Sequence, residues 1–309
     1  MPDTEQRVPR TADTVTDEPR TTDAAALAAR YGLLQSTARP TLVTYVRQLW
    51  RRRQFVLAYS SARKAQTYSS SRLGQIWQVL TPLMQAGVYF LIFGMLLRLD
   101  RGIEDYPAFL VTGVFVFTFM QRSMNNGAKS ISGNLQMIRA LHFPRAVLPL
   151  SFVLVEFQQL IVSMFVLFAF ILAVGVPISV TWLLVVPAML LQMLFNMGLS
   201  LFMARLGAGS SDINQLLPFI TRIWFYMSGI FYSIERFTKH APEPIQHILT
   251  LNPGAAFLDL YRGVLIDSHN PLEMPWGLHA WEVCAAWAVL FLVGGFLFFW
   301  RREERYGRG

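Results

Sequence analysis

The chain alternates long apolar runs with short polar segments, and the first run sets the pattern for the rest. From Val79 to Leu97 there are 19 consecutive residues without a charge. A helix of that length rises about 28 Å, which is close to the thickness of the hydrocarbon core of a bilayer. Pro82 lies in the first turn of the run, where a helix tolerates proline, and Trp77 precedes it at the predicted lipid boundary. The run therefore predicts a transmembrane helix.

Five further apolar runs follow, so the pattern predicts an all-α integral membrane protein with six transmembrane helices. The second run is short and passes directly into a polar stretch. Together the runs form a six-span domain over residues 79–300. We expect the spans near residues 79–98, 106–122, 147–174, 180–204, 213–233 and 279–300.

The composition agrees with this class. Hydrophobic residues make up 53% of the chain and charged residues only 15%, whereas soluble domains average about 25% charged residues. The single cysteine, Cys284, excludes an internal disulfide and a metal centre built from thiolates. The net charge of +8 comes from basic residues that flank apolar runs, so we expect membrane contact and no nucleic acid partner.

The segment before the first span is strongly basic. Residues 24–99 contain ten Lys and Arg and no acid. Within residues 41–59 the apolar positions recur at helical spacing, while Arg47, Arg51 and Arg52 lie off the apolar stripe. This pattern predicts an amphipathic helix at the cytoplasmic membrane surface, held by anionic lipids. A soluble helix packed on a partner protein is the alternative, and both can hold.

The distribution of charge predicts the orientation. Residues 30–78, the loop at 122–146 and the tail at 301–309 are basic, whereas segments 98–106 and 234–278 carry eight acids against five Lys and Arg. By the positive-inside rule, the basic segments are cytosolic. We therefore expect a multi-pass protein of the bacterial inner membrane with both termini in the cytoplasm.

Three segments outside the spans complete the predicted organisation. Residues 1–39 are polar and lack the apolar core of a signal peptide, so we expect a disordered cytosolic tail. Residues 40–78 form the interfacial region. The outer segment 234–278 contains Asn252-Pro253, a typical helix start, which predicts short outer-face helices before the last span.

The sequence lacks the motifs of an enzyme. The fragment Gly127-Ala-Lys-Ser130 has no upstream glycine, so it does not form a phosphate-binding loop. No metal-binding or nucleophile motif is present, and the five histidines have no ligand spacing. We therefore expect a non-enzymatic chain without cofactor or metal, so that a transporter driven by ATP would need a separate ATPase subunit.

Three polar residues lie inside the predicted spans at similar depth, namely Glu156, Asn196 and Arg222. Charged side chains at such depth pair with each other or face water. One hypothesis is that Glu156 pairs with Arg222. The alternative is that Arg222 faces an aqueous path and holds an anionic substrate.

The chain resembles the membrane subunits of ABC exporters for polysaccharides, a family that includes the O-antigen (Wzm-type) and teichoic acid permeases. The resemblance covers nearly the whole chain beyond about residue 40. It rests on three groups of residues in the family's order: Leu73, Gly74, Trp77, Leu80 and Pro82; Phe143, Pro144, Arg145 and Pro149; Asn252, Pro253, Tyr261 and Arg262.

The resemblance implies a permease that exports a lipid-linked polysaccharide. It implies a homodimer with two ATP-binding cassette subunits, which hold the ATP and Mg²⁺, and a polyprenyl-pyrophosphate-linked polysaccharide as substrate. The first and fifth spans would line the channel. Their aromatic residues, on which sugar rings stack, are Tyr89, Phe90, Phe93, Trp224, Phe225, Tyr226, Phe231 and Tyr232.

The family also implies roles for cytosolic residues. The loop that contains residues 134–145 would couple the permease to the ATPase. Its candidate residues are Met137, Arg139, His142, Phe143, Pro144 and Arg145. The basic residues at the entrance, which could recruit the pyrophosphate of the carrier or simply contact lipid, are Arg47, Arg51, Arg52, Arg53 and Arg72.

Two other functions compete with this interpretation. An ABC permease for a drug or a small lipid would not need the aromatic lining or the basic surface helix. A membrane glycosyltransferase or phosphotransferase would need clustered acids at a membrane face, whereas here the acids are scattered. The residue usage of the tails suggests a high-GC bacterium, which by resemblance points to an actinobacterial galactan exporter.

Overall fold

The computed structural model describes residues 41–306 except 69–73, 75, 99–102, 104, 142 and 236–241. Every regular element in this part of the chain is helical, which confirms the predicted all-α class. The predicted disordered tail, residues 1–39, lies outside the described residues. Two of the predicted site residues, Arg72 and His142, also lie outside them.

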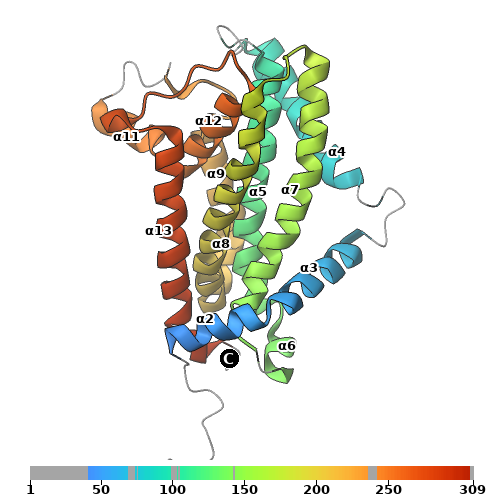
Figure 1. Ribbon diagram of the computed structural model, residues 1–309, viewed down its shortest axis with the longest axis vertical. Helices are drawn as coiled ribbons and strands as arrows, with labels where there is room; N and C mark the ends of the chain where they lie inside the picture. The colour runs from blue at the N-terminus through green and yellow to red at the C-terminus, as the bar shows by residue number, and fades with distance from the viewer. Residues whose placement is uncertain are drawn as a thin grey trace, which may run out of the picture. The chain divides into compact units, whose positions relative to one another are not determined.

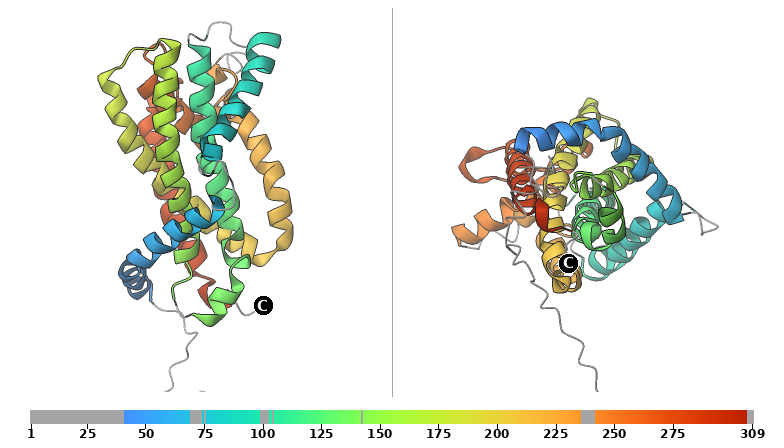
Figure 2. Two further views of the ribbon diagram at one scale, coloured as in Figure 1. Left: turned by 90° about the vertical axis from the view of Figure 1, so that its right-hand side faces the viewer. Right: turned by 90° about the horizontal axis from the view of Figure 1, so that it is seen from below.

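Four long helices form the centre of the bundle, and they run side by side in Figures 1 and 2. They are α5 (Tyr106–Ser132), α7 (Val147–Val174), α8 (Val185–Gly209) and α13 (Ala280–Trp300). Helix α5 packs against α7 and α8, and α8 also packs against α13. Most residues of α5 are buried, so this helix is the core of the bundle.

Small residues let these helices approach closely. A Cβ atom added to Gly198 of α8 would collide with the backbone of Phe291 in α13, and one added to Gly295 would collide with the backbone of Gly198. A Cβ atom at Gly207 would collide with Ala128 of α5 in the same way. Such backbone contacts are typical of helices that associate by van der Waals packing within a membrane.

Two helices lie at the edge of the bundle. The first is α4 (Ile76–Tyr89), which continues into the π-helix η1 (Phe90–Leu96) and packs on α5 and α7. The second is α9 (Ser211–Met227), which packs on α5, α8 and α12 (Pro253–Leu265). Only 22% of the window Val79–Leu96 is buried, so one face of this segment is not covered by the described residues of the chain.

The two ends of the bundle carry different elements. At one end lie α2 (Leu42–Arg51), α3 (Arg53–Tyr68), α6 (Leu135–Ala140) and η4 (Glu303–Arg305), with α2 crossing the end of the bundle in Figure 1. At the other end lie η2 (Val180–Leu184), α11 (Glu243–Thr250), α12 (Pro253–Leu265) and η3 (Pro275–Gly277).

We call these the basic end and the acidic end. The described basic residues at the first include Arg47, Arg51, Arg52, Arg53, Arg63, Lys64, Arg139, Arg145, Arg301 and Arg302, and they outnumber the acids Glu303 and Glu304 of η4. The described acids at the second are Asp105, Glu235, Glu243, Asp259, Asp267, Glu273 and Glu282. The charge asymmetry seen along the sequence is therefore also an asymmetry between the two ends of the folded chain.

Four of the predicted spans match helices that are long and apolar enough to cross a membrane, namely Val79–Leu96, Val147–Val174, Val180–Gly209 and Ala280–Trp300. The runs at 106–122 and 213–233 correspond to α5 and α9, which are not among these four. The count of six spans therefore stays a prediction.

Two predicted boundaries were wrong. Helix α5 continues past Arg122 to Ser132, so the loop expected at 122–146 begins only at Gly133. A charged residue indicates where a helix leaves the lipid, but the backbone hydrogen bonds of the helix continue beyond it. The single surface helix expected over 41–59 is two helices, because the backbone at Arg52 leaves the helical conformation between α2 and α3.

Candidate functional site

Aromatic residues from α4–η1 and from the end of α9, predicted as two separate groups, contact each other. The ring of Tyr89 lies 5.6 Å from that of Phe225 and 4.9 Å from that of Phe231. Phe93 stacks on Phe231 with 4.2 Å between centroids. Tyr226 also lies 5.6 Å from Phe231. The cluster therefore joins the first predicted span to the fifth.

The members of this aromatic cluster differ in exposure. Phe231 and Phe225 are only 1% and 8% exposed, so their rings pack inside the protomer. Phe90 lies 6.2 Å from Tyr106 and packs towards α5. Tyr226 is 45% exposed, and its carbonyl accepts a hydrogen bond from the hydroxyl of Tyr232. That these rings face a channel stays a prediction, and Tyr226 is the best placed of them to do so.

Trp224, another predicted channel residue, connects α9 to α12. Its indole Nε1 donates to Oδ1 of Asn252 over 2.7 Å. Asn252 also caps α12, because the same oxygen accepts from the backbone N of Gly254, and its Nδ2 donates to the hydroxyl of Ser228. Since Asn252 begins α12 and Ser228 ends α9, one amide side chain holds the two helix ends together.

Arg262 provides a second connection between the same elements. Its guanidinium donates to the carbonyls of Gly229 (3.0 Å) and Ile230 (3.1 Å), just beyond the end of α9. It also donates to the carbonyl of Phe109 and lies over that ring. Asn252 and Arg262 belong to the family motif in the sequence, which predicted no partner for either side chain. The structure shows that both connect the end of α9 to α12, and that Arg262 also connects α12 to α5.

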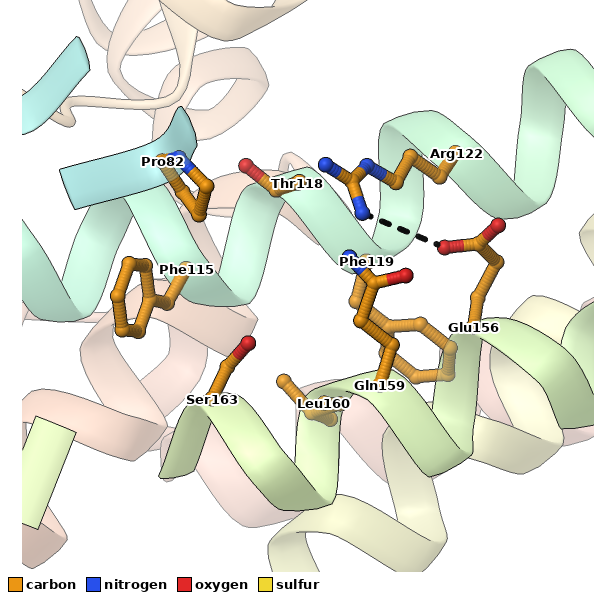
Figure 3. A pocket seen from close by; sticks show the side chains of 9 residues that line it. All are labelled: Pro82, Phe115, Thr118, Phe119, Arg122, Glu156, Gln159, Leu160 and Ser163. Carbon is orange, nitrogen blue, oxygen red and sulfur yellow. Dashed lines mark ion pairs between the residues drawn. The ribbon is translucent and has the colours of Figure 1, made fainter. Parts of the chain in front are cut away.

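A small polar pocket lies between α4, α5 and α7, and Figure 3 shows Arg122 and Glu156 facing each other beside it. Nη1 of Arg122 lies 3.8 Å from Oε2 of Glu156. Asn126 donates its Nδ2 to Oε1 of the same carboxylate over 2.8 Å. Thr118, Gln159 and Ser163 add further polar groups to the lining.

The hypothesis that Glu156 pairs with Arg222 was therefore wrong. The partner is Arg122, which sequence analysis placed in a loop and which the continuation of α5 brings to the level of Glu156. Arg222 is exposed on α9. Asn196, the third member of the predicted polar belt, is fully buried, and neither its Oδ1 nor its Nδ2 has a hydrogen-bond partner among the described residues.

The predicted coupling loop is a compact segment, residues 133–146, and we call it the coupling segment. Its helix α6 buries Ile138 and half-buries Met137, while Arg139 is exposed. Phe143 packs on Phe55 of α3 at 5.9 Å, and Pro144 is buried. The segment is therefore packed against the surface helices at the basic end.

Hydrogen bonds hold both ends of the coupling segment. At its start, the hydroxyl of Tyr59 in α3 donates to Oδ1 of Asn134 over 3.0 Å. At its end, the backbone N of Ala146 donates to the hydroxyl of Tyr45 in α2 over 3.1 Å. The backbone N of Arg145 donates to the carboxylate of Glu303 over 2.9 Å. The surface helices and the tail thus hold the segment from two sides.

The basic residues predicted at the entrance are exposed where the structure describes them. Arg47, Arg51, Arg52 and Arg53 lie on the outside of α2 and α3. Beside them Val43 and Trp50 are 70% and 69% exposed, although Tyr45 of the same helix is buried. One face of α2 packs on the protein, and the exposed apolar face beside the arginines is suited to the interfacial zone of a bilayer.

Comparison with known proteins identifies the class of this chain. The chain belongs to the ABC-2 type transporter family, whose model matches residues 54–266. It is 30% identical over 201 residues to the O-antigen export system permease protein RfbA of Klebsiella pneumoniae, an alignment that covers 65% of this chain and 75% of that protein. It is 24% identical over 266 residues to the O-antigen export system permease protein RfbA of Myxococcus xanthus, an alignment that covers 85% of this chain and 98% of that protein.

Proposed function

We propose that this chain is the membrane subunit of an ABC exporter that moves a lipid-linked polysaccharide, of the O-antigen type, across the bacterial inner membrane. The family membership and the names of its relatives support transport of this class. The observation that carries the proposal is the aromatic cluster between α4–η1 and α9. Tyr226, the most exposed ring of the cluster, offers an apolar face on which sugar rings stack.

The exporter is a homodimer in this proposal, with the channel between the two copies. The support is the apolar surface that a single protomer leaves open on α4–η1 and α9. A soluble monomer rarely exposes so much contiguous apolar area, so lipid or a second copy has to cover it. The residues that form it are Met84, Val88, Leu91, Met95, Leu216, Phe219, Ile220 and Ile223, each more than 40% exposed.

The basic end faces the cytoplasm in this proposal, because basic loops remain on that side. Two ATP-binding subunits, which carry the ATP and Mg²⁺, dock there against the coupling segment. Arg139 is exposed on α6 and is the accessible basic residue of that helix. Arg47, Arg51 and Arg52 are placed to attract the pyrophosphate of the carrier lipid or anionic lipid head groups.

Co-expression with the ATP-binding subunit encoded beside this gene tests the proposal. In a strain that lacks both genes, the pair should restore the strain's surface polysaccharide, and either gene alone should not. A variant of the ATP-binding subunit without its phosphate-loop lysine is the matched control. Restoration by that variant, or a change in drug resistance without any change in surface polysaccharide, would refute the proposal.

A further inference from the structure

Glu303 lies where three separate parts of the chain meet at the basic end. It follows the last helix, α13, by three residues and begins η4. Its Oε1 accepts the backbone N–H of Arg145, at the end of the coupling segment, over 2.9 Å. Its Oε2 accepts the hydroxyl of Tyr45, in the surface helix α2, over 2.9 Å.

The hydroxyl of Tyr45 also bonds to the end of the coupling segment. The Tyr45 oxygen accepts the backbone N–H of Ala146 while its proton is donated to Glu303. A carboxylate accepts on both oxygens and donates on neither, so it matches the two donors that face it. Neutral glutamine would retain one acceptor but would leave the Tyr45 proton without one.

The junction is buried. Glu303 is 7% exposed, Tyr45 is 1% exposed and Ala146 is fully buried. The tail is folded back onto α13, because Tyr306 stacks on Phe299 at 4.7 Å and donates to its carbonyl. Tyr45 also contacts Phe296 of α13 through its ring, at 5.9 Å. Loss of the carboxylate would therefore leave buried donors that water cannot easily reach.

We propose that Glu303 is a positioning residue for energy coupling. It holds the end of the coupling segment to α2 and to the last helix, so that a push on the segment moves these elements together instead of α7 alone. Without this attachment the coupling segment moves by itself, and its movement is not transmitted to α2 and α13. The inference rests on the proposed function, because it requires an ATPase that acts on the coupling segment.

The test uses the full permease with its ATP-binding subunit, in lipid nanodiscs for ATP hydrolysis and in cells for surface polysaccharide. Glu303→Ala and Tyr45→Phe should retain the amount of co-purified ATPase and an ATP hydrolysis rate within about twofold of wild type. Export should fall about tenfold, as the loss of a buried hydrogen bond to a charge shifts an equilibrium by at least that factor. Export by Glu303→Gln, which keeps one acceptor oxygen, should lie between that of these two variants and that of wild type.

The neighbouring Glu304 is exposed and supplies the matched control, since Glu304→Gln removes the same charge and leaves the three hydrogen bonds of Glu303 and Tyr45 in place. It should export as wild type does. If export and hydrolysis decline in parallel with the amount of complex, Glu303 has only a role in folding and the inference is wrong. Normal export by Tyr45→Phe and Glu303→Gln would also refute it. Failure of the wild-type pair to export would instead refute the proposed function.

Discussion

Replacement of Arg122 by methionine would leave a carboxylate buried in the bundle without its cationic partner. The side chain of Glu156 is only 9% exposed, whereas that of Arg122 is 29% exposed, and the two charged groups are 3.8 Å apart. The hydrogen bond from Asn126 remains in the variant and compensates in part. Arg122→Met should therefore destabilise the protein, and removal of Glu156 as well should restore much of the loss.

The magnitude follows from this geometry. Removal of one partner from a fully buried ion pair costs about 3–5 kcal/mol. The long separation, the partial exposure of Arg122 and the remaining Asn126 contact reduce the expected cost to about 1–2 kcal/mol. At about 2–4 °C per kcal/mol, the melting temperature should fall by roughly 2–8 °C.

The assay is a double-mutant cycle on the purified protein in detergent, with unfolding followed by tryptophan fluorescence. The cycle combines Arg122→Met with Glu156→Leu and should give a coupling energy of about 1–2 kcal/mol. Arg222→Met is the matched control, because Arg222 is exposed on α9 and should show no coupling to Glu156. A coupling energy near zero for Arg122, or an equal one for Arg222, would refute the pairing.

Three further predictions concern packing, orientation and pH. Gly295→Ala should lower the melting temperature by more than about 5 °C because its Cβ collides with α8, whereas Gly294→Ala, with no atom within 4 Å, should change it little. An impermeant thiol reagent applied to intact spheroplasts should label Glu243→Cys and not Gln136→Cys, both exposed positions; the reverse pattern would invert the proposed orientation. Burial raises the pKa of Glu303 above its ordinary value of 4.5, so the folded protein holds this proton more firmly than the unfolded chain. The stability of the wild type should therefore fall relative to that of Glu303→Gln as the pH rises from 4.5 through the pKa of Glu303 in the folded protein. An equal pH dependence of the two melting temperatures over this range would contradict the assignment.

The apolar runs predicted most of the fold, because a run of sufficient length in a chain with few charges has one stable structure in lipid. The helix expected at 147–174 has those same bounds in the structure. The predicted end of the second helix was wrong, because Arg122 and Lys129 were taken to mark a loop. They lie within α5, where hydrogen bonding continues and Arg122 has Glu156 as a partner.

The site was predictable only in part. The family resemblance proposed roles for the aromatic residues and the coupling segment, which stay predictions, and it did not show that Tyr89 and Phe93 contact Phe231. Glu303 was missed because it lies among arginines in a segment that was counted as a free basic tail. Its role depends on contacts with Tyr45 and Arg145, which are more than 150 residues away in the chain. The one local signal was an acidic pair in a basic tail.

The connection between α9 and α12 has a consequence for inhibition. Asn252 bonds to Trp224, and Arg262 bonds to carbonyls at Gly229 and Ile230, so the end of α9 cannot shift without α12. In the proposed orientation α12 lies on the far side of the membrane from the ATPase. An antibody fragment or cyclic peptide that clamps α11 and α12 from outside would therefore also immobilise a helix that lines the proposed channel. Such an inhibitor would arrest the exporter without entering the cytoplasm or competing with ATP.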